Sequence, residues 1–261
     1  MKKLHFTYEM QIDYSSQVNS CNFTIKCIPA DTLRQKIDNI KINMYPETDY
    51  QWGKDGFKNL QIWGKEDKPH KSFRFRIEGD AQTGLSEFEE CEDTDLSMVF
   101  SCPHGLNKAG ETIRNFFDKK INNIDACTYD KVIAVTKLLF EAFKYQSGST
   151  NVNTTAEEAF SQGCGVCQDY SHILIALLHL LGITARYVTG FIIGEGESHA
   201  WVEFLDDGKW YGIDPTNNTP VNDDYIKIGH GRDARDCTIN RGIMQGGGLH
   251  TQTVSVNVRE A

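Results

Sequence analysis

The stretch Gly163–Leu181 (GCGVCQDYSHILIALLHLL) decides how this chain should fold. Residues 173–181 are apolar on almost every side, and such a pattern predicts a helix that is buried in the centre of a domain. Gly182 follows directly and is typical of a helix C-terminus. We therefore expect a helix that begins near Cys167 and forms the middle of the core, with other elements packed around it.

The segments on either side of this helix have their own periods. Apolar residues at helical spacing predict one helix from about Asn107 to Ile121 and a second over 132–143. After the central helix the pattern changes to that of strands, which we expect at 187–193, 200–205, 210–213 and 254–258. Helices followed by adjacent strands indicate an α+β core.

The first third of the chain has a different character. Apolar and polar residues alternate over much of 4–98, with turn-rich pieces between the runs, which predicts an antiparallel β-sandwich-like module or half-barrel. The acidic stretch 87–95 (EFEECEDTD) breaks this period, and we interpret it as a solvated linker. The sequence thus predicts two domains: an N-terminal β module at 1–98 and a core at 99–261.

The composition excludes several classes of function. Of the 261 residues, 39% are hydrophobic and 24% are charged, and 27 Lys and Arg against 36 Asp and Glu give a net charge of −9. This sign disfavours binding to nucleic acid or to an anionic membrane surface. The first ten residues alternate instead of forming an apolar export signal, so we expect a cytoplasmic protein whose eight cysteines are reduced. The oligomeric state is open.

Cys167 is the first candidate for chemistry. At the N-terminus of a buried helix, the helix dipole and free backbone N–H groups favour the thiolate form of a cysteine. The same N–H groups could bind the oxyanion that forms when a thiolate attacks a carbonyl. The alternative is that Cys167 is a small buried hydrophobic residue.

Cys164 and Cys167 also fit the C-x-x-C pattern of a redox dithiol or of half a zinc site. Zinc needs four ligands, the sequence has no second such pair, and we interpret His172 and His179 as structural residues of the central helix. We expect Cys164 to be a bystander at the turn into the helix, although the dithiol stays open. We expect no metal and no cofactor.

A histidine and an aspartate follow on two neighbouring predicted strands. His199 begins the strand 200–205, Asp214 ends the strand 210–213, and the short turn between the strands predicts a hairpin. In such a hairpin the carboxylate of Asp214 can orient one ring nitrogen of His199 while the other nitrogen faces a thiol. That is the arrangement of a catalytic triad.

The block 143–236 resembles the transglutaminase-like superfamily of papain-type cysteine enzymes, in its bacterial branch, and the N-terminal β region resembles the module that precedes this core in many bacterial members. The resemblance rests on six motifs in order, namely YQSGST (145–150), GVCQDYSH (165–172), LGITARYVTG (181–190), SHAWV (198–202), DPT (214–216) and GRD (231–233). Thr184 stands where a proline is usual.

The resemblance implies a function and a set of roles. It makes Cys167 the nucleophile, His199 the base and Asp214 the residue that orients the base. The implied enzyme is a cysteine protease or amidase that forms a thioester with a peptide or protein substrate. The alternatives are a transglutaminase, in which an amine replaces water, and a silent module that only binds peptides. Gln162 is a candidate oxyanion donor, and we interpret Arg186 and the pair of Arg232 with Asp233 as structural ion pairs.

Overall fold

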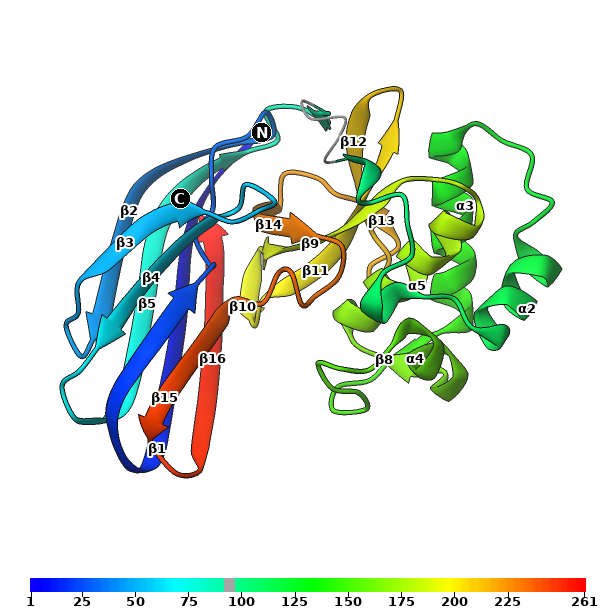
Figure 1. Ribbon diagram of the computed structural model, residues 1–261. Helices are drawn as coiled ribbons and strands as arrows, with labels where there is room; N and C mark the ends of the chain where they lie inside the picture. The colour runs from blue at the N-terminus through cyan, green and yellow to red at the C-terminus, as the bar shows by residue number, and fades with distance from the viewer. Residues whose placement is uncertain (92–96) are drawn as a thin grey trace.

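The computed structural model describes residues 1–91 and 97–261, so part of the predicted acidic linker, residues 92–95, lies outside the described residues. The described chain forms two lobes, an all-β lobe and a lobe that contains all the longer helices (Figure 1). Both lobes contain antiparallel sheet. The predicted α+β class with an N-terminal β module is confirmed.

The β lobe is built around one long strand that turns back on itself. β1 pairs with β16 and β5 through its first half, and with β15 and β4 through its second half, after an irregularity between Asp13 and Val18. The two halves therefore lie in two layers, and Phe23 of one contacts Phe73 of the other with ring centroids 5.4 Å apart. The strands are β1 (Lys2–Ile25), β2 (Gln35–Tyr45), β3 (Tyr50–Lys54), β4 (Leu60–Glu66), β5 (His70–Thr83), β15 (Asn240–Gly246) and β16 (His250–Glu260).

Two of these strands come from the far end of the sequence. β15 and β16 pair along nearly the whole of β1, so residues 240–260 belong to the β lobe. The predicted boundary between residues 98 and 99 places residues 240–260 in the core domain instead. The alternation of Val254, Val256 and Val258 predicts a strand with one buried face, but it does not specify the sheet in which that strand pairs.

The second lobe has helices on one side of a sheet with the order β13-β12-β11-β9-β14. Its central helix is α5, which packs against β11 and β9 and whose residues 169–178 are all buried. The helical elements are η1 (Gly105–Asn107), α2 (Glu111–Lys120), α3 (Thr128–Ala142), α4 (Ala156–Gln162) and α5 (Cys167–Leu180). The strands of this lobe are β6 (Phe88–Glu90), β7 (Lys144–Tyr145), β8 (Cys164–Gly165), β9 (Ala185–Ile192), β11 (His199–Asp206), β12 (Lys209–Asp214), β13 (Thr219–Pro220) and β14 (Tyr225–Gly231). The short strand β10 (Gly194–Gly196) pairs with β16 and so joins the sheet of the β lobe.

Part of the predicted acidic linker is structured. Phe88–Glu90 forms β6, which pairs with β12. Glu89 accepts a hydrogen bond from Lys227 at 2.8 Å, and Arg186 pairs with both Glu89 and Glu203. The interpretation as a solvated linker was therefore wrong for residues 88–90. The buried cations of Arg186 and Lys227 hold this strand in place, although its acidic sequence is typical of a solvent-exposed segment. The expectation that Arg186 forms a structural ion pair is confirmed.

The two lobes share a hydrophobic core. Phe191, Ile226 and Ile228 belong to the sheet of the helical lobe, yet they lie in the apolar cluster of the β lobe. Phe191 contacts Phe6 and Tyr8 with ring centroids 5.8 and 5.9 Å apart. The lobes are thus held against each other by burial of apolar surface. No helix in the described part of the chain is long and apolar enough to cross a membrane.

Candidate active site

Cys167 is the first residue of α5, and the sequence around it fixes that helix end. The N–H of Val166 donates to Oδ2 of Asp169 at 2.8 Å, and the hydroxyl of Thr150 donates to the same oxygen at 2.6 Å. A β-carbon at Gly165 would lie 2.5 Å from this oxygen, so glycine is needed for the close approach. The helix start expected at Cys167 is confirmed. The carboxylate of Asp169, three residues after the N-cap residue Val166, caps this end of the helix.

The capping carboxylate is unusual in its surroundings. Asp169 is fully buried, and its Oδ1 has no hydrogen-bond partner among the described residues. Burial raises the pKa of Asp169, although the hydrogen bonds from Thr150 and Val166 act in the opposite direction. The backbone in front of Cys167 is thus held by a group that is costly to ionise.

His199 and Asp214 meet as the predicted hairpin requires. β11 and β12 are antiparallel with Val202 opposite Ile213, and a two-residue turn at Asp207 and Gly208, both with positive φ, joins them. Nε2 of His199 lies 2.7 Å from Oδ2 of Asp214. The expected contact between this histidine and this aspartate is confirmed.

Asp214 is fully buried and held by several donors besides His199. The hydroxyl of Tyr225 and the side-chain amide of Asn217 each donate to Oδ2 at 2.8 Å, and the N–H of Thr216 donates to Oδ1 at 2.8 Å. Burial alone would raise the pKa of Asp214, but the hydrogen bond with His199 and those from Tyr225 and Asn217 lower it overall. The carboxylate is therefore charged and fixed in orientation.

The ring of His199 connects this carboxylate to the thiol. Burial would lower the pKa of His199, but its hydrogen bonds with Asp214 and Cys167 raise it to about 10. Nε2 of His199 faces Asp214, and Cys167 lines the same cleft as His199. The contact of His199 with Asp214 is thus observed, whereas the role of Cys167 as the nucleophile stays a prediction.

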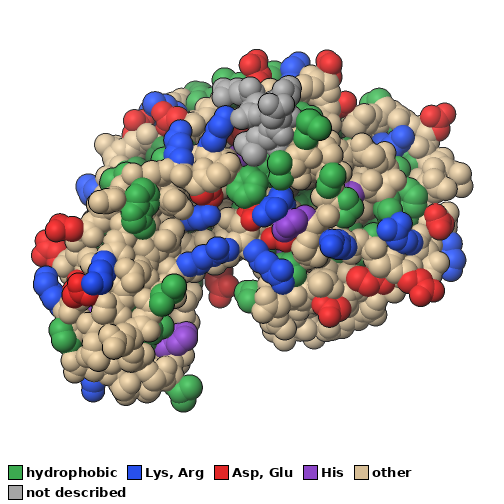
Figure 2. All heavy atoms as spheres, viewed as in Figure 1, with side chains coloured by type: hydrophobic (Ala, Val, Ile, Leu, Met, Phe, Trp, Pro, Cys, Tyr) green, Lys and Arg blue, Asp and Glu red, His purple; other side chains and the backbone are tan. Residues whose placement is uncertain are grey.

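Cys167 and His199 line an open cleft of about 520 Å³ between the two lobes, whereas Asp214 is fully buried. Figure 2 shows the molecule hollowed between the lobes, and the cleft has walls from both. The helical lobe contributes Cys167, His199 and residues of the segment 234–239, and the β lobe contributes Tyr8, Asn240, Gln252 and Val254. A cleft of this size accommodates an extended segment of a larger ligand.

Other predicted features have different positions. The side-chain amide of Gln162 donates to the carbonyl of Ser149 at 3.1 Å and lies 3.6 Å from the sulfur of Cys164, so it is engaged beside Cys164. Arg232 pairs with Asp236 at 2.8 Å instead of with Asp233, whose carboxylate accepts backbone N–H groups of Leu106 and Arg235. The expected pair of Arg232 with Asp233 was therefore wrong.

The two histidines of α5 are structural, as expected. Nε2 of His172 accepts the N–H of Ala234 at 3.1 Å, and burial lowers the pKa of His172 to about 4. His179 contacts the carbonyl of Phe100 at 2.8 Å. Within residues 1–91 and 97–261, no three His, Cys, Asp or Glu side chains come together as metal ligands, and Cys164 and Cys167 form no disulfide.

Sequence reasoning missed two residues that hold the aspartate. Asn217 follows Asp214 by three positions, so a search for a side chain that closes the turn after Asp214 could have found it. Tyr225 is eleven positions away on β14, and only the fold brings its hydroxyl to Asp214. No local signal in the sequence points to Tyr225.

Two family models match the chain. The transglutaminase-like superfamily matches residues 116–215, and the bacterial transglutaminase-like N-terminal region matches residues 4–82. An uncharacterized protein of Mycobacterium tuberculosis is 35% identical over 275 residues, an alignment that covers 91% of this chain and 86% of that protein. An uncharacterized protein of Mycobacterium leprae is 34% identical over 137 residues, which is 49% of each chain.

The fold also has a solved counterpart. The crystal structure of a putative cysteine protease from Cytophaga hutchinsonii superposes with a TM-score of 0.84 at 23% identity, over 99% of this chain and 90% of that one. At this level of identity the likeness establishes the shared fold, including the β lobe as well as the helical lobe.

Proposed function

We propose that this chain, which belongs to the transglutaminase-like superfamily, is a cysteine hydrolase of amide or peptide bonds. It also carries the bacterial transglutaminase-like N-terminal region. The observation that carries this proposal is the 2.7 Å hydrogen bond between His199 and the buried Asp214, together with the position of Cys167, at the start of α5, in the wall of the same open cleft as His199. The substrate class is a peptide or protein.

In the first half of the reaction, Cys167 acts as a thiolate beside protonated His199. The sulfur attacks the carbonyl carbon of the substrate, and the backbone N–H groups at the start of α5 stabilise the negative charge that develops on the oxygen. His199 gives its proton to the leaving amine, the C–N bond breaks, and a thioester remains on Cys167. Asp214 holds the ring in the orientation that this transfer needs.

In the second half, neutral His199 takes a proton from a water molecule as the water attacks the thioester. The C–S bond breaks, the carboxylic acid product leaves, and the thiolate with protonated His199 is restored. Each proton that leaves the ring in acylation returns to it in deacylation. This cycle consumes water and uses Cys167, His199 and Asp214 with the backbone N–H groups at the start of α5.

Water is favoured over an amine as the second substrate. A transglutaminase must exclude water well enough for a dilute amine to compete, and that requires a dedicated acceptor site. The aromatic residues that could form one are used elsewhere: Trp201 is buried against Tyr225, and Trp210 is buried under the guanidinium of Arg186 at 4.1 Å. The open cleft beside His199 supports hydrolysis.

The decisive experiment offers the purified protein glutamine-containing and acylated peptides together with a millimolar primary amine. We expect mainly hydrolysis product, abolished in Cys167→Ala and retained in the matched variant Cys164→Ala. A predominance of amine adduct would assign the chain as a transglutaminase instead. If Cys167 reacts with a small electrophile but no peptide is turned over across a broad library, the module is silent or its substrate is not a peptide.

A further inference from the structure

We propose that the N-terminal β lobe supplies a pocket for an apolar side chain of the substrate bound at Cys167. The pocket lies between the two layers of that lobe and has a volume of about 240 Å³. The inference rests on the proposed function for the reaction and extends it by naming the substrate class: a peptide with a large apolar residue near the bond that is cleaved.

The pocket adjoins the cleft that contains Cys167. Asn240 and Gln252 line both cavities. On β16, Val256, Val254, Gln252 and His250 share one face, because residues two apart on a strand point to the same side. Along this inner face Val256 is buried in the core, Val254 lines the cleft, Gln252 lines both cavities and His250 lines the pocket. A side chain of a ligand in the cleft therefore lies next to the pocket, separated from it by Asn240 and Gln252.

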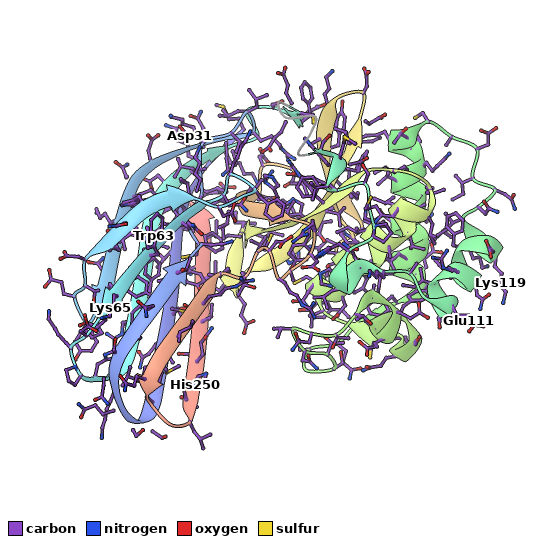
Figure 3. All side chains as sticks on the ribbon, in the orientation of Figure 1. Asp31, Trp63, Lys65, Glu111, Lys119 and His250 are labelled. Atoms are coloured by element: carbon purple, nitrogen blue, oxygen red, sulfur yellow. The ribbon has the colours of Figure 1, made fainter. Side chains whose placement is uncertain are left out.

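The β lobe is sealed at one end and open at the other. Toward the helical lobe, Phe191, Ile226 and Ile228 fill the space against its inner face. Toward the far end, β16 carries His250, which is exposed and which Figure 3 labels at the lower end of the lobe. The described residues thus leave this end of the inner face uncovered.

The walls favour an uncharged occupant with a large apolar part. Ile12, Phe23, Phe73 and Met244 line the pocket, polar side chains such as Asn240, Gln252 and His250 also line it, and of the described residues in its wall none is Asp, Glu, Lys or Arg. Methionine adapts its shape to different apolar groups. The volume is below the roughly 300–1,000 Å³ of pockets that enclose whole drug-sized ligands, so it suits a single Phe, Leu or Met side chain.

The approach to the thiol on the opposite side is apolar as well. Val152 of the helical lobe lines the cleft and is 71% exposed. An exposed apolar residue at the rim of a cleft that leads into an apolar pocket is typical of a binding surface. The favoured occupant is accordingly part of the substrate chain that already lies in the cleft.

The test uses a pocket-filling variant with a matched control. A β-carbon at Gly242, which lines the pocket, would meet only the carbonyl oxygen of Asn22 at 3.5 Å, so Gly242→Phe fills the pocket without a backbone clash. Ile243 is the next residue, points to the outer face and is 79% exposed. Ile243→Phe therefore adds an aromatic ring to the same strand outside the pocket.

The probes are peptidyl acyloxymethyl ketones, which alkylate a thiolate, with one Phe moved through an all-alanine background. In the unmodified protein we expect one position at which Phe accelerates labelling of Cys167 about tenfold over the all-alanine probe, the gain expected for burying one aromatic side chain. In Gly242→Phe this ratio should fall to within about twofold of unity. In Ile243→Phe it should persist.

A second reagent separates this inference from the proposed function. If iodoacetamide labels Cys167 but no Phe position is favoured, or if the preference survives Gly242→Phe, the pocket proposal is overturned and the hydrolase proposal stands. If iodoacetamide fails to label Cys167, the hydrolase proposal fails. Peptides of the same sequences, with an amide in place of the reactive ketone, are then titrated into Cys167→Ala by calorimetry. This variant has no thiol to react at that position, so the titration tests binding to the pocket alone.

The binding experiment has its own opposing outcomes. Binding of the Phe peptide that is lost in Gly242→Phe supports the pocket, and no binding refutes it. A dimer seen by light scattering that Gly242→Phe dissociates would also refute it, because the occupant would then be a second copy of the chain.

Discussion

Asp214 controls the charge on the ring of His199. Its carboxylate raises the pKa of His199 to about 10, together with Cys167 and against the effect of burial. We expect Asp214→Asn to lower peptide hydrolysis about 100-fold or more, because the ring loses both its orientation and the partner of its charge. The measurement is kcat/KM as a function of pH.

The expected shift of the pH profile in Asp214→Asn has a definite direction. Acylation needs protonated His199 to release the amine, so activity declines as pH rises through the pKa of that ring. Without the carboxylate this pKa falls, and the alkaline limb of the profile should move to lower pH. Asp223→Asn, on the loop before β14, is the control and should keep the profile. An unmoved limb in Asp214→Asn would contradict the pairing.

Thiol selectivity separates the nucleophile from its neighbour. We expect sub-stoichiometric iodoacetamide at neutral pH to modify Cys167 first, because it lies at the start of α5 in the same cleft as His199. Cys102 and Cys127 are more exposed but lie outside this cleft, so they should react more slowly. Peptide mapping by mass spectrometry is the readout. Preferential labelling of Cys164, or a disulfide between Cys164 and Cys167, would revive the dithiol interpretation.

The candidate site was predictable from the sequence to the extent that chemistry is local. Cys167, His199 and Asp214 were found because a helix start and a short hairpin are signals within a few residues. Tyr225 was missed because its contact with Asp214 depends on the order of strands in the sheet. The role of Gln162 as an oxyanion donor stays a prediction, because the structure shows its side-chain amide bonded to the carbonyl of Ser149.

At the scale of elements, the start of α5 depends on the buried carboxylate of Asp169. Asp169→Ala should lower the free energy of unfolding by about 1–3 kcal/mol, because it leaves the Val166 N–H and the Thr150 hydroxyl without their acceptor. Asp169→Asn keeps an acceptor oxygen and should cost less. Urea denaturation of both variants measures the difference, and equal losses would show that the cap is unimportant.

The same pair of variants has a pH signature. The pKa of Asp169 is raised in the folded state, so the stability gained by burying the neutral acid is present below the ordinary value of 3.8 and is lost as pH rises through the raised pKa. The unmodified protein should lose stability relative to Asp169→Asn over this window. A constant difference across pH would contradict the burial argument.

The attachment of β6 depends on a buried ion cluster. Glu203 on β11 faces Arg186 and Lys227, and these two cations lower its pKa to about 2 despite burial. We expect Glu203→Gln to lower the free energy of unfolding by about 3–5 kcal/mol, because two buried cations lose a partner. The contribution should be present above about 4.5, the ordinary pKa, and lost as pH falls toward about 2. Glu195→Gln, on an exposed strand, should change little.

The limits of sequence reasoning at this scale have physical causes. Alternation of apolar residues predicted the strands of the β lobe, and the apolar run predicted α5, because each element buries its own face. Strand pairing is not encoded in that pattern, so the return of β15 and β16 to β1 was not foreseen. β6 escaped prediction because charges distant in sequence stabilise it.

At the scale of the whole molecule, the β lobe needs residues from both ends of the described chain. We expect a fragment of residues 1–98 to remain unfolded, because β1 lacks its partners on one side and its apolar face stays exposed. The same fragment joined by a flexible linker to residues 239–261 should show cooperative thermal unfolding by circular dichroism. A cooperatively folded 1–98 fragment would contradict this interpretation.

The pairing of β1 with β16 also sets the timing of biosynthesis. β1 leaves the ribosome before the entire helical lobe, whereas β16 follows it. Contacts between such distant segments form late and slowly. A nascent chain therefore acquires its thiol, histidine and aspartate well before Gln252 and Val254 complete the wall of the cleft. The cleft reaches its final shape only once those residues have emerged from the exit tunnel. A complete site therefore forms later than the translation of Cys167, His199 and Asp214.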